Sequence, residues 1–598
     1  MKRLISVVFI MSLVVSVSAQ QLAFPTAKGY GRFAEGGRHR YPTRPELVKV
    51  VAVTNLLDDV DNPPEGSFRW ALNQGTATII VNNVSVTVQV PMTIVFKVGG
   101  VIDLKGDIRV QKKYLTIAGE TALGDGICFK GGTLNFSGSE NIIVRYIRSR
   151  PGDVLREEAS ACRLENGSNY IFDHCSFSWG IEETTHYSHS DNFTIQWCIL
   201  SEALYYSIHK KGERGYAAQW GGQYASYHHN LLAHNQSRNP RINGSNADDI
   251  EALVDYRNNV NYNWGTSGAF YGGEFENTPG CSGFAKTNVV NNYFKPGPGT
   301  SGSTFAAPSL QRSGTTFCGY AQWYFDGNVM EGNAGKTADN WTGVDAGAVG
   351  GIDNIKSTVE AVQSDGVLEN YDDYTQSAND AYDSVIVDVG ATLPSRDAID
   401  DRIIKEMTGD ISIVRYQHVI EGITTPVRGL TAGIIDTQKN LVQDTLTQSP
   451  WDCYQTVTSD QAPTDTDNDG MPDDWETANG LNPNDGSDFV TITASGYSNL
   501  ELYLFSLTGD EVPVSTFNTK LQPVINVYPN PVMDQFSLQC SDKIKDVKLY
   551  DLFGRMVMNL TDKLNDDSIN ADHLMNGCYI IRAVSDNGKV VVVKLIKK

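Results

Sequence analysis

Short runs of alternating apolar and polar residues recur through the middle of the chain. Each run fits a strand of about five residues and is followed by a polar turn. The aligned runs end at Ile147, Cys175, Cys198, Asn230, Asn259, Asn292 and Asn328, which are 23 to 36 residues apart. Because no helical periodicity lies between them, the spacing favours a solenoid with one coil per repeat over a βαβ barrel.

Asparagine occupies the end of the run in the last four of these repeats. Stacked amide side chains can each donate to one neighbour and accept from the other, so we expect an asparagine ladder. Cys175 and Cys198 hold the matching place in two earlier repeats, where we expect them to stack as small apolar side chains in the core. A sandwich of hairpins is the alternative, but two-residue Asn-Gly loops are scarce. The repeats predict an all-β fold built on a parallel β-helix.

Changes in composition divide the chain into four predicted parts. In residues 1–19, two basic residues, an apolar run and a small-residue cleavage site at Ala19 are typical of a signal peptide. Residues 20–460 hold the repeats and, from about 334, an acidic and partly helical stretch that we expect to wrap or cap the solenoid. Residues 461–515 are an acidic repeat and linker, and residues 522–598 are rich in valine, lysine and turn residues. No later stretch reaches the roughly 18 uncharged apolar residues of a membrane span, so we expect an exported monomer.

The formal net charge of −22 argues against a nucleic-acid partner, because phosphate binding needs a basic face. An acidic substrate remains compatible with this charge only if bound cations or a local basic cleft mediate the contact. The nine cysteines are an odd number without zinc spacing. Cys281 with Cys318, or Cys540 with Cys578, could pair in an oxidising compartment.

Residues 465–476 fit the twelve-position calcium loop D-x-[DN]-x-[DN]-G-x₅-E in full. In such a loop alternate carboxylates surround one ion, a glycine allows the sharp turn, and a final glutamate completes the shell. The predicted ligands are Asp465, Asp467, Asp469, the carbonyl of Met471, Asp473 and Glu476. Because no amphipathic helix precedes it, the loop resembles an isolated repeat of the thrombospondin type 3 or dockerin kind. We expect a structural Ca²⁺ here, with an unoccupied acidic linker as the alternative.

Further motifs follow one another along the first half of the chain. They are Ala23–Gly31, Gly36–Arg38, Val53–Leu56, Gly66–Arg69, Thr116–Thr121, Arg148–Asp153, Asp173–Ser176, Tyr227–Asn230 and Ser237–Arg241. In this order they resemble the pectate lyase family of polysaccharide lyases, and the likeness fades after Arg402. The resemblance implies a right-handed parallel β-helix, which agrees with the repeats. It also implies Ca²⁺-dependent β-elimination of acidic plant cell-wall polysaccharide, polygalacturonate or pectin, to give unsaturated oligogalacturonides.

The resemblance also assigns roles to single residues. Arg238 matches the arginine that takes the C5 proton of a galacturonate unit. Lys210, with Lys211 as a near-equal candidate, matches a substrate-binding lysine. Asn243 stands where the family has a second arginine, so we expect Arg241 to supply that contact with its planar fork.

Chemistry explains why the reaction needs a cation. Removing a proton beside an ionised carboxylate adds negative charge to that carboxylate, and a cation held by hard oxygen ligands offsets this charge. We expect Asp153, Glu182 and Glu183 to hold that Ca²⁺. In better-known members of the family two aspartates occupy a segment that aligns with Glu158 and Ser160 here. Because an arginine pKa above about 12 leaves little neutral guanidine at pH 7, we expect an alkaline rate optimum.

The last part of the chain carries another set of motifs, at 528–531, 547–555, 574–577 and 589–598. These resemble type IX secretion sorting domains. The resemblance implies a small β-sandwich, recognition by secretion machinery, and a location outside the cell or on the outer-membrane surface. A carbohydrate-binding sandwich is the alternative, but Tyr550, Phe553 and Tyr579 fit core positions better than an exposed platform.

Two other functions remain open from the sequence. A β-helix glycoside hydrolase would need paired carboxylates, for which Asp248 and Asp249 are the candidates. A non-catalytic pectin-binding surface protein would use the same solenoid without turnover.

Overall fold

The computed structural model describes most of the chain in two compact units, Met1–Val512 and Pro513–Lys598. Outside the described residues lie 1–20, 39–43, 82–83, 154, 156, 267, 362–372, 418, 421–422, 425–431, 443–453, 455–460, 513–524, 529–531, 541–543, 552–554, 564–567 and 586–589. The predicted signal peptide at 1–19 is therefore outside the description. Across the described ranges, no helix is both long enough and apolar enough to pass through a bilayer.

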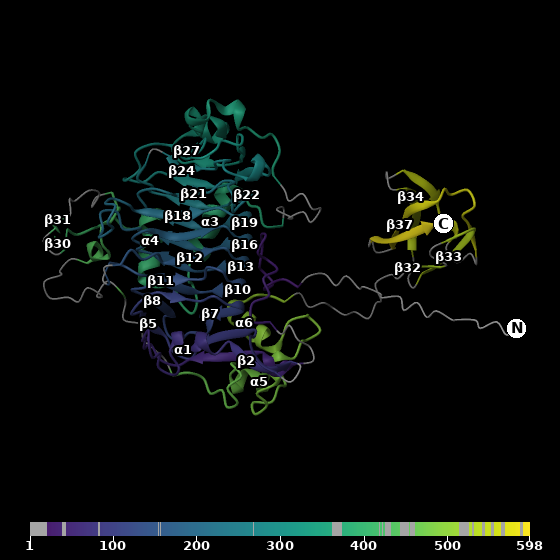
Figure 1. Cartoon of the computed structure of the whole chain (residues 1–598), viewed down its shortest axis with the longest axis horizontal. Coiled ribbons are helices and arrows are strands. Elements are labelled where there is room, and N and C mark those ends of the chain that lie inside the picture. The colour runs from purple at the N-terminus through teal and green to yellow at the C-terminus, as the bar shows by residue number, and fades with distance from the viewer. Residues whose placement is uncertain are drawn as a thin grey trace. The chain divides into compact units, whose positions relative to one another are not determined.

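The first unit is built on a parallel β-helix whose coils each supply strands to three sheets (Figure 1). Sheet 1 contains β1 (Lys49–Val53), β4 (Met92–Phe96), β7 (Lys113–Ala118), β10 (Glu140–Arg145), β13 (Ser168–Asp173), β16 (Asp191–Gln196), β19 (Gln223–His228), β22 (Glu251–Arg257), β25 (Phe284–Val290) and β28 (Gln322–Asp326). Sheet 2 contains β5 (Gly100–Asp103), β8 (Ile127–Lys130), β11 (Ile147–Arg150), β14 (Ser176–Ser178), β17 (Ile199–Ser201), β20 (Leu231–Ala233), β23 (Val260–Tyr262), β26 (Tyr293–Lys295) and β29 (Val329–Met330). Sheet 3 contains β6 (Ile108–Arg109), β9 (Leu134–Asn135), β12 (Cys162–Glu165), β15 (Glu183–Ser188), β18 (Tyr216–Trp220), β21 (Arg241–Ile242), β24 (Gly268–Gly272) and β27 (Thr304–Pro308). This arrangement confirms the predicted solenoid.

Alternating side chains fill the interior of the β-helix in stacked rows. Tyr170 stacks on Phe193 with ring centroids 4.4 Å apart, and the Phe193 ring lies 5.7 Å from that of Tyr227. Tyr227 in turn stacks on Trp220 at 4.2 Å. These four side chains are completely buried, so burial of apolar area, together with the direct aromatic contacts, holds successive coils in register.

The turn from sheet 1 to sheet 2 repeats the same geometry from coil to coil. One residue there adopts a left-handed conformation, as at His174 (φ 50°), Trp197 (φ 54°) and His229 (φ 56°). These rings stack, with centroids 5.8 Å apart between His174 and Trp197 and 4.3 Å apart between Trp197 and His229. The successive turns therefore form a second stack of rings, separate from the stack in the interior of the β-helix.

The next residue of each turn forms the predicted ladder. The side-chain amide of Asn230 donates to Asn259 Oδ1 (3.0 Å), Asn259 to Asn292 Oδ1 (3.1 Å), and Asn292 to Asn328 Oδ1 (2.9 Å). At the same place in earlier coils, the main-chain N–H of Cys175 lies 3.4 Å from Cys198 Sγ. Both the asparagine ladder and the buried cysteine stack are confirmed.

The other elements of the first unit lie outside these three sheets. They are α1 (Phe68–Asn73), the antiparallel hairpin β2 (Thr76–Val81) and β3 (Val84–Gln89), α2 (Ala334–Ala338), α3 (Ala378–Asp388), α4 (Ala398–Thr408), the short pair β30 (Val419–Ile420) and β31 (Ile423–Thr424), α5 (Asp473–Ala478) and α6 (Asn499–Thr508), with the 3₁₀ turns η1 (Pro45–Leu47), η2 (Gly119–Thr121), η3 (Pro279–Cys281), η4 (Asn340–Gly343), η5 (Gly347–Val349), η6 (Ile352–Asn354), η8 (Gln438–Leu441) and η9 (Asp488–Val490). Val385 of α3 and Ile403 of α4 pack on sheet 2 in one apolar cluster. Arg150 of β11 forms ion pairs with Asp397 and Asp400 at the start of α4, which fixes this wrap to the coil.

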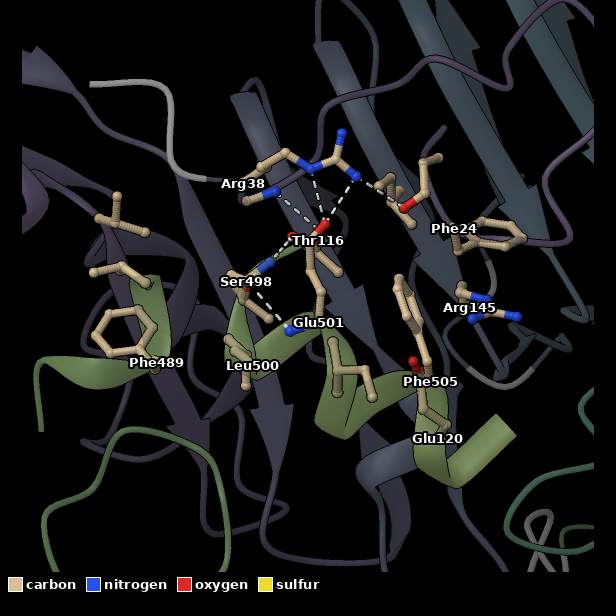
Figure 2. A pocket seen from close by; sticks show the side chains of 17 residues that line it. Phe24, Arg38, Thr116, Glu120, Arg145, Phe489, Ser498, Leu500, Glu501 and Phe505 are labelled. Atoms are coloured by element: carbon tan, nitrogen blue, oxygen red, sulfur yellow. Dashed lines mark hydrogen bonds and ion pairs between the residues drawn. The ribbon is translucent and has the colours of Figure 1, made fainter. Parts of the chain in front are cut away.

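Residues 461–512, which we call the acidic module, pack on the outer face of sheet 1 beside the first coils (Figure 1). Helix α6 begins with a capping box between Ser498 and Glu501, and Arg38 Nε donates to Glu501 (2.9 Å). Figure 2 shows Phe505 of α6 beside Phe24, around a cavity of about 30 Å³. The apolar side of α6 thus covers strands that would otherwise face solvent.

The second unit is a small antiparallel β-sandwich. One sheet has the order β32 (Ile525–Tyr528), β33 (Gln535–Cys540), β36 (Ile569–Asn570), and the other β35 (Met556–Asn559), β34 (Ile544–Asp551), β37 (Gly577–Ser585), β38 (Val590–Lys597), with the turn η10 (Thr561–Lys563). Phe536, Leu549 and Ile581 share one core that draws on both sheets. Tyr579 is buried there as predicted, Tyr550 is only half-buried, and Phe553 lies outside the described residues.

Cys281 and Cys318 form a disulfide, as the sequence allowed. The side chains of Cys540 and Cys578 fall outside the described part of the structure. Cys128, Cys162, Cys175 and Cys198 are free thiols in the buried core.

Replacing Asn259 by alanine should destabilise the protein by about 1–3 kcal/mol, because the buried N–H and amide of Asn230 lose their acceptor. The midpoint of urea unfolding measures this effect. Asn62→Ala, at an exposed bend, is the control and should change stability by less than about 0.5 kcal/mol. Equal stability of the two variants would show that the ladder is not a stabilising element.

Candidate active site

A polar row runs along the outer face of sheet 3. The in-register residues of this row are Arg163, His186, Gln219, Arg241 and Tyr271, from β12, β15, β18, β21 and β24. Their neighbours Tyr187, Trp220 and Ile242 point into the core instead. Because side chains alternate along a strand, filling the core with these apolar residues forces the polar row outward.

A neighbouring row on the same face places Arg238. Glu183 pairs in register with Tyr216, and Tyr216 forms a parallel bridge to Ser237, the residue before Arg238. Arg238 adopts a left-handed conformation (φ 57°), and its guanidinium lies 4.1 Å from the Tyr216 ring centroid. One terminal nitrogen donates to the Glu183 carboxylate and to Gln219 Oε1 (2.6 Å). The arginine is thereby held by groups from two adjacent coils.

Arg214 lies on the same aromatic ring. Its guanidinium carbon is 4.4 Å from the Tyr216 centroid, and its terminal nitrogen donates to Glu182 at 2.6 Å. The same nitrogen is 4.0 Å from Glu183. Tyr216 therefore packs against two guanidinium groups, which share a pair of adjacent carboxylates.

His209 holds the Glu182 carboxylate from the opposite side. His209 Nδ1 accepts the main-chain N–H of Lys211 (3.0 Å), which leaves Nε2 to carry the proton and donate to Glu182. Burial alone would raise the pKa of Glu182, but the bond from His209 and the charge of Arg214 hold that pKa below its usual value. His209 thus acts as a hydrogen-bond donor that keeps Glu182 ionised and oriented.

Glu158 completes this carboxylate group. One ligand atom each from Glu158, Glu182 and His209 lie within 4.8 Å of one another. The main-chain N–H of Lys210 donates to Glu158 (2.9 Å), and the Lys210 ammonium lies 3.0 Å from the same carboxylate. That N–H bond holds the pKa of Glu158 below its usual value.

The structure does not place Asp153 with these carboxylates. Asp153 is buried against η8, where Gln438 Nε2 donates to its Oδ1 (2.7 Å) and its main-chain N–H donates to Gln438 Oε1 (3.1 Å). Glu158, at the position that aligns with a family aspartate, lies beside Glu182 instead. In the sequence, only the alignment with a family aspartate indicated that Glu158 belongs to this group.

The predicted substrate-binding residues differ in their surroundings. Arg241 donates to Glu274 (2.8 Å) and to Asn243 Oδ1, so Asn243 orients the arginine in place of a second basic side chain. The Lys210 side chain is 76% exposed and Lys211 is also exposed. Sequence reasoning missed Tyr216, Gln219 and His209, because aromatic, amide and imidazole groups at strand ends carry no distinctive spacing. We call Glu158, Glu182, Glu183, Gln219, Arg238 and Arg241 the Arg238 site.

The predicted calcium loop also forms a carboxylate cluster, in the acidic module. Ligand atoms of Asp465, Asp467 and Asp469 lie within 4.8 Å of one another. A second such group joins Asp469, Glu476 and Asp488. Asp488 lies outside the sequence pattern and was not predicted.

The other two predicted loop ligands lie as follows. Asp473 accepts two hydrogen bonds from Thr466, one from the main-chain N–H and one from the hydroxyl, both 2.7 Å. Met471 buries its side chain completely, and its main-chain N–H donates to Asp469 (3.0 Å). Through its two hydrogen bonds with Thr466, Asp473 stabilises the shape of the loop.

Comparison with known proteins gives consistent results for both units. Residues 526–598 match the family model described as a secretion system C-terminal sorting domain. A probable pectate lyase C of Aspergillus terreus is 32% identical over 499 residues, covering 82% of this chain and 95% of that protein. A probable pectate lyase C of Emericella nidulans is 32% identical over 492 residues, covering 81% and 93%.

Solved structures give weaker overall superpositions. Pectate lyase Bsp165PelA from Bacillus sp. N165, in complex with trigalacturonate, is 17% identical with a TM-score of 0.37, covering 61% of this chain and 98% of that one. Pectate lyase C from Erwinia chrysanthemi, at pH 9.5 with 30 mM Ca²⁺, is 14% identical with a TM-score of 0.35, covering 63% and 99%.

Proposed function

Since the chain belongs to the pectate lyase family and is a secreted, pectate-cleaving polysaccharide lyase, we propose that Arg238 is its catalytic base in a Ca²⁺-dependent β-elimination. The observation that carries this proposal is the position of Arg238. On an outward face of the β-helix its guanidinium contacts both Glu183 and Gln219, and the in-register neighbour of Gln219 on the next coil is Arg241. The substrate is polygalacturonate or pectin, and the product is an unsaturated oligogalacturonide.

The carboxylates of Glu158, Glu182 and Glu183 fit the requirements of a calcium site. They supply hard oxygen donors from two neighbouring coils, and two of them already approach each other closely. In the structure their charge is balanced by Lys210, Arg214 and Arg238. When bound, Ca²⁺ would offset the charge that develops on the substrate carboxylate as the neighbouring proton leaves.

Arg238 and Arg241 have different roles in this proposal. To accept a proton, Arg238 must exchange its contact with Glu183 for one with the sugar ring, while Gln219 and Tyr216 keep the guanidinium in place. Arg241, fixed by Glu274 and Asn243, can present its planar fork to a substrate carboxylate. The exposed Lys210 can reach a second carboxylate of the polymer.

The glycoside hydrolase alternative is less well supported. Its candidate pair differs in environment: the Asp248 side chain is 69% exposed, whereas Asp249 is buried and accepts the main-chain N–H of His189 (3.1 Å). A carboxylate engaged in this way holds a turn and is poorly placed to activate water. The absence of turnover on every pectin tested would support a pectin-binding surface protein instead.

Export follows from the second unit. We propose that secretion machinery of type IX recognises residues 526–598 after a signal peptide at 1–19 has directed the chain across the inner membrane.

Arg238→Lys should lower kcat by about 10² to 10⁴-fold, because an ammonium cannot occupy the same position as the guanidine base. Absorbance of the unsaturated product measures turnover, and co-sedimentation with insoluble pectate measures binding, which should persist. Arg555→Lys, at an exposed arginine of the second unit that pairs with Asp551, is the control. Full turnover by Arg238→Lys would assign the base to another residue.

The rate should depend on both calcium and pH. A chelator should abolish formation of the product double bond, and added Ca²⁺ should restore it. The kcat profile should rise toward alkaline pH, because an arginine base gains its neutral form there. A kcat maximum below pH 6, or cleavage that survives the chelator, would contradict the mechanism.

Glu158→Gln should raise the Ca²⁺ concentration for half-maximal rate by about tenfold or more, because the cation loses a charged ligand. Asp153→Asn should leave that concentration unchanged, since Asp153 binds Gln438. Initial rates over a calcium titration, taken below the unfolding temperature of each variant, measure the difference. The reverse result would return Asp153 to the ligand set in place of Glu158.

A further inference from the structure

The acidic module contains a cluster of five carboxylates that the Arg238 site does not use. Three come from the loop before α5, one from α5 and one from η9; they are Asp465, Asp467, Asp469, Glu476 and Asp488. The two groups of ligand atoms within 4.8 Å share Asp469, so the five side chains surround one region. Like charges at this distance repel one another unless a cation lies among them.

Several oxygens of this cluster are buried without a protein hydrogen bond. They are Asp465 Oδ1, both oxygens of Asp467, Asp469 Oδ2, both oxygens of Glu476, and Asp488 Oδ1. Asp469 is 2% exposed and Glu476 is fully buried. A buried carboxylate oxygen without a partner is costly, and so many in one place indicate a missing positive ligand.

Basic side chains among the described residues do not balance this charge. Lys97 lies 2.9 Å from Asp465, which leaves four of the five carboxylates without an ion pair to a side chain among the described residues.

We propose that Asp465, Asp467, Asp469, Glu476 and Asp488 bind a Ca²⁺ ion that fastens the acidic module to the first coils of the β-helix. Calcium suits the site because every donor is a hard oxygen and the set exceeds the four ligands of a tetrahedral zinc site. Asp488 supplies a ligand from outside the loop pattern, while Asp473 is occupied by Thr466. This site is independent of the proposed function, since it shares no residue with the Arg238 site.

The loop that bears these carboxylates is pressed against sheet 1. Gly470 has φ 94°, and a Cβ there would come within 2.7 Å of Val50 on β1. The adjacent Met471 is fully buried in a cluster with Val48 and Ala118 of the β-helix. The shape of the loop therefore decides whether Met471 reaches this cluster.

The same module contributes α6, which covers further coils. Phe505 packs with Ile143 and Ile171 of β10 and β13. Asp510, after the end of α6, pairs with Arg145 on β10 (2.8 Å). Without the ion, repulsion among the carboxylates would open the loop and loosen this cover over the strands from β1 to β13.

The full-length protein allows a direct test by terbium luminescence and thermal unfolding. Trp475 precedes Glu476 in α5 and can sensitise Tb³⁺ bound at the cluster. Calcium should raise Tm and displace Tb³⁺ in the unmodified protein. Glu476→Gln and Asp488→Asn should each lose most of the Tb³⁺ signal and the Tm increase. Asp474→Asn, a charge change in the same helix outside the cluster, should retain both.

Activity separates this site from the catalytic one. Below their unfolding temperatures, Glu476→Gln and Asp488→Asn should need the same Ca²⁺ concentration for half-maximal rate as the parent. Glu158→Gln should keep the Trp475-sensitised signal. Equilibrium dialysis on folded protein covers the case of a poorly expressed variant, since the parent should hold one more Ca²⁺ per chain than any folded cluster variant. The proposal is overturned if both cluster variants retain the Tb³⁺ signal and Tm increase, and the role of Asp488 is overturned if Asp488→Asn alone retains them.

Discussion

Register between successive coils is the constraint on which this structure depends. Because each strand pairs in parallel with its counterpart one coil away, a side chain always lies above the equivalent side chain of the previous coil. On the strands, a position that is apolar in every coil becomes a continuous internal row and a polar position becomes an external row, whereas the asparagines of the turns form the buried ladder. The Arg238 site results from this rule, since Glu183, Tyr216 and Ser237 occupy one row and Gln219 and Arg241 the next.

The distribution of charge explains how an acidic chain can act on an acidic polymer. Many carboxylates form buried ion pairs inside the molecule. Examples are Asp400 of the wrap with Arg150, and Asp173 with Arg145 on sheet 1. Others gather where a divalent cation can neutralise them. At the Arg238 site, Arg214 pairs with Glu182 and Arg238 pairs with Glu183. The local charge therefore differs from the net charge of −22. A negative net charge, which argues against a nucleic-acid partner, is therefore compatible with a pectate substrate.

The sequence predicted the solenoid well because the evidence for it is local and repeated. A run that ends in asparagine, such as the one at Asn292, predicts both a strand and a ladder position, and the next coil repeats the test. The position of Arg238 followed from a linked motif. Asp153 and Glu158 could not be told apart in this way, because both follow β11 in one loop and only the path of that loop decides which side chain meets Glu182. Asp488 was beyond reach for a related reason, since it joins the calcium loop through a turn that the loop pattern does not contain.

The four free cysteines in the described part of the core imply an order of events for an exported chain. Their thiols lie inside the β-helix or under its wrap, and burial raises the pKa of Cys128 to about 11, so reactive thiolate is scarce once the coils have closed. Before closure the same thiols would be open to the oxidising enzymes that can join Cys281 to Cys318. Correct disulfide pairing therefore requires that the coils assemble faster than wrong disulfides form between residues such as Cys175 and Cys198.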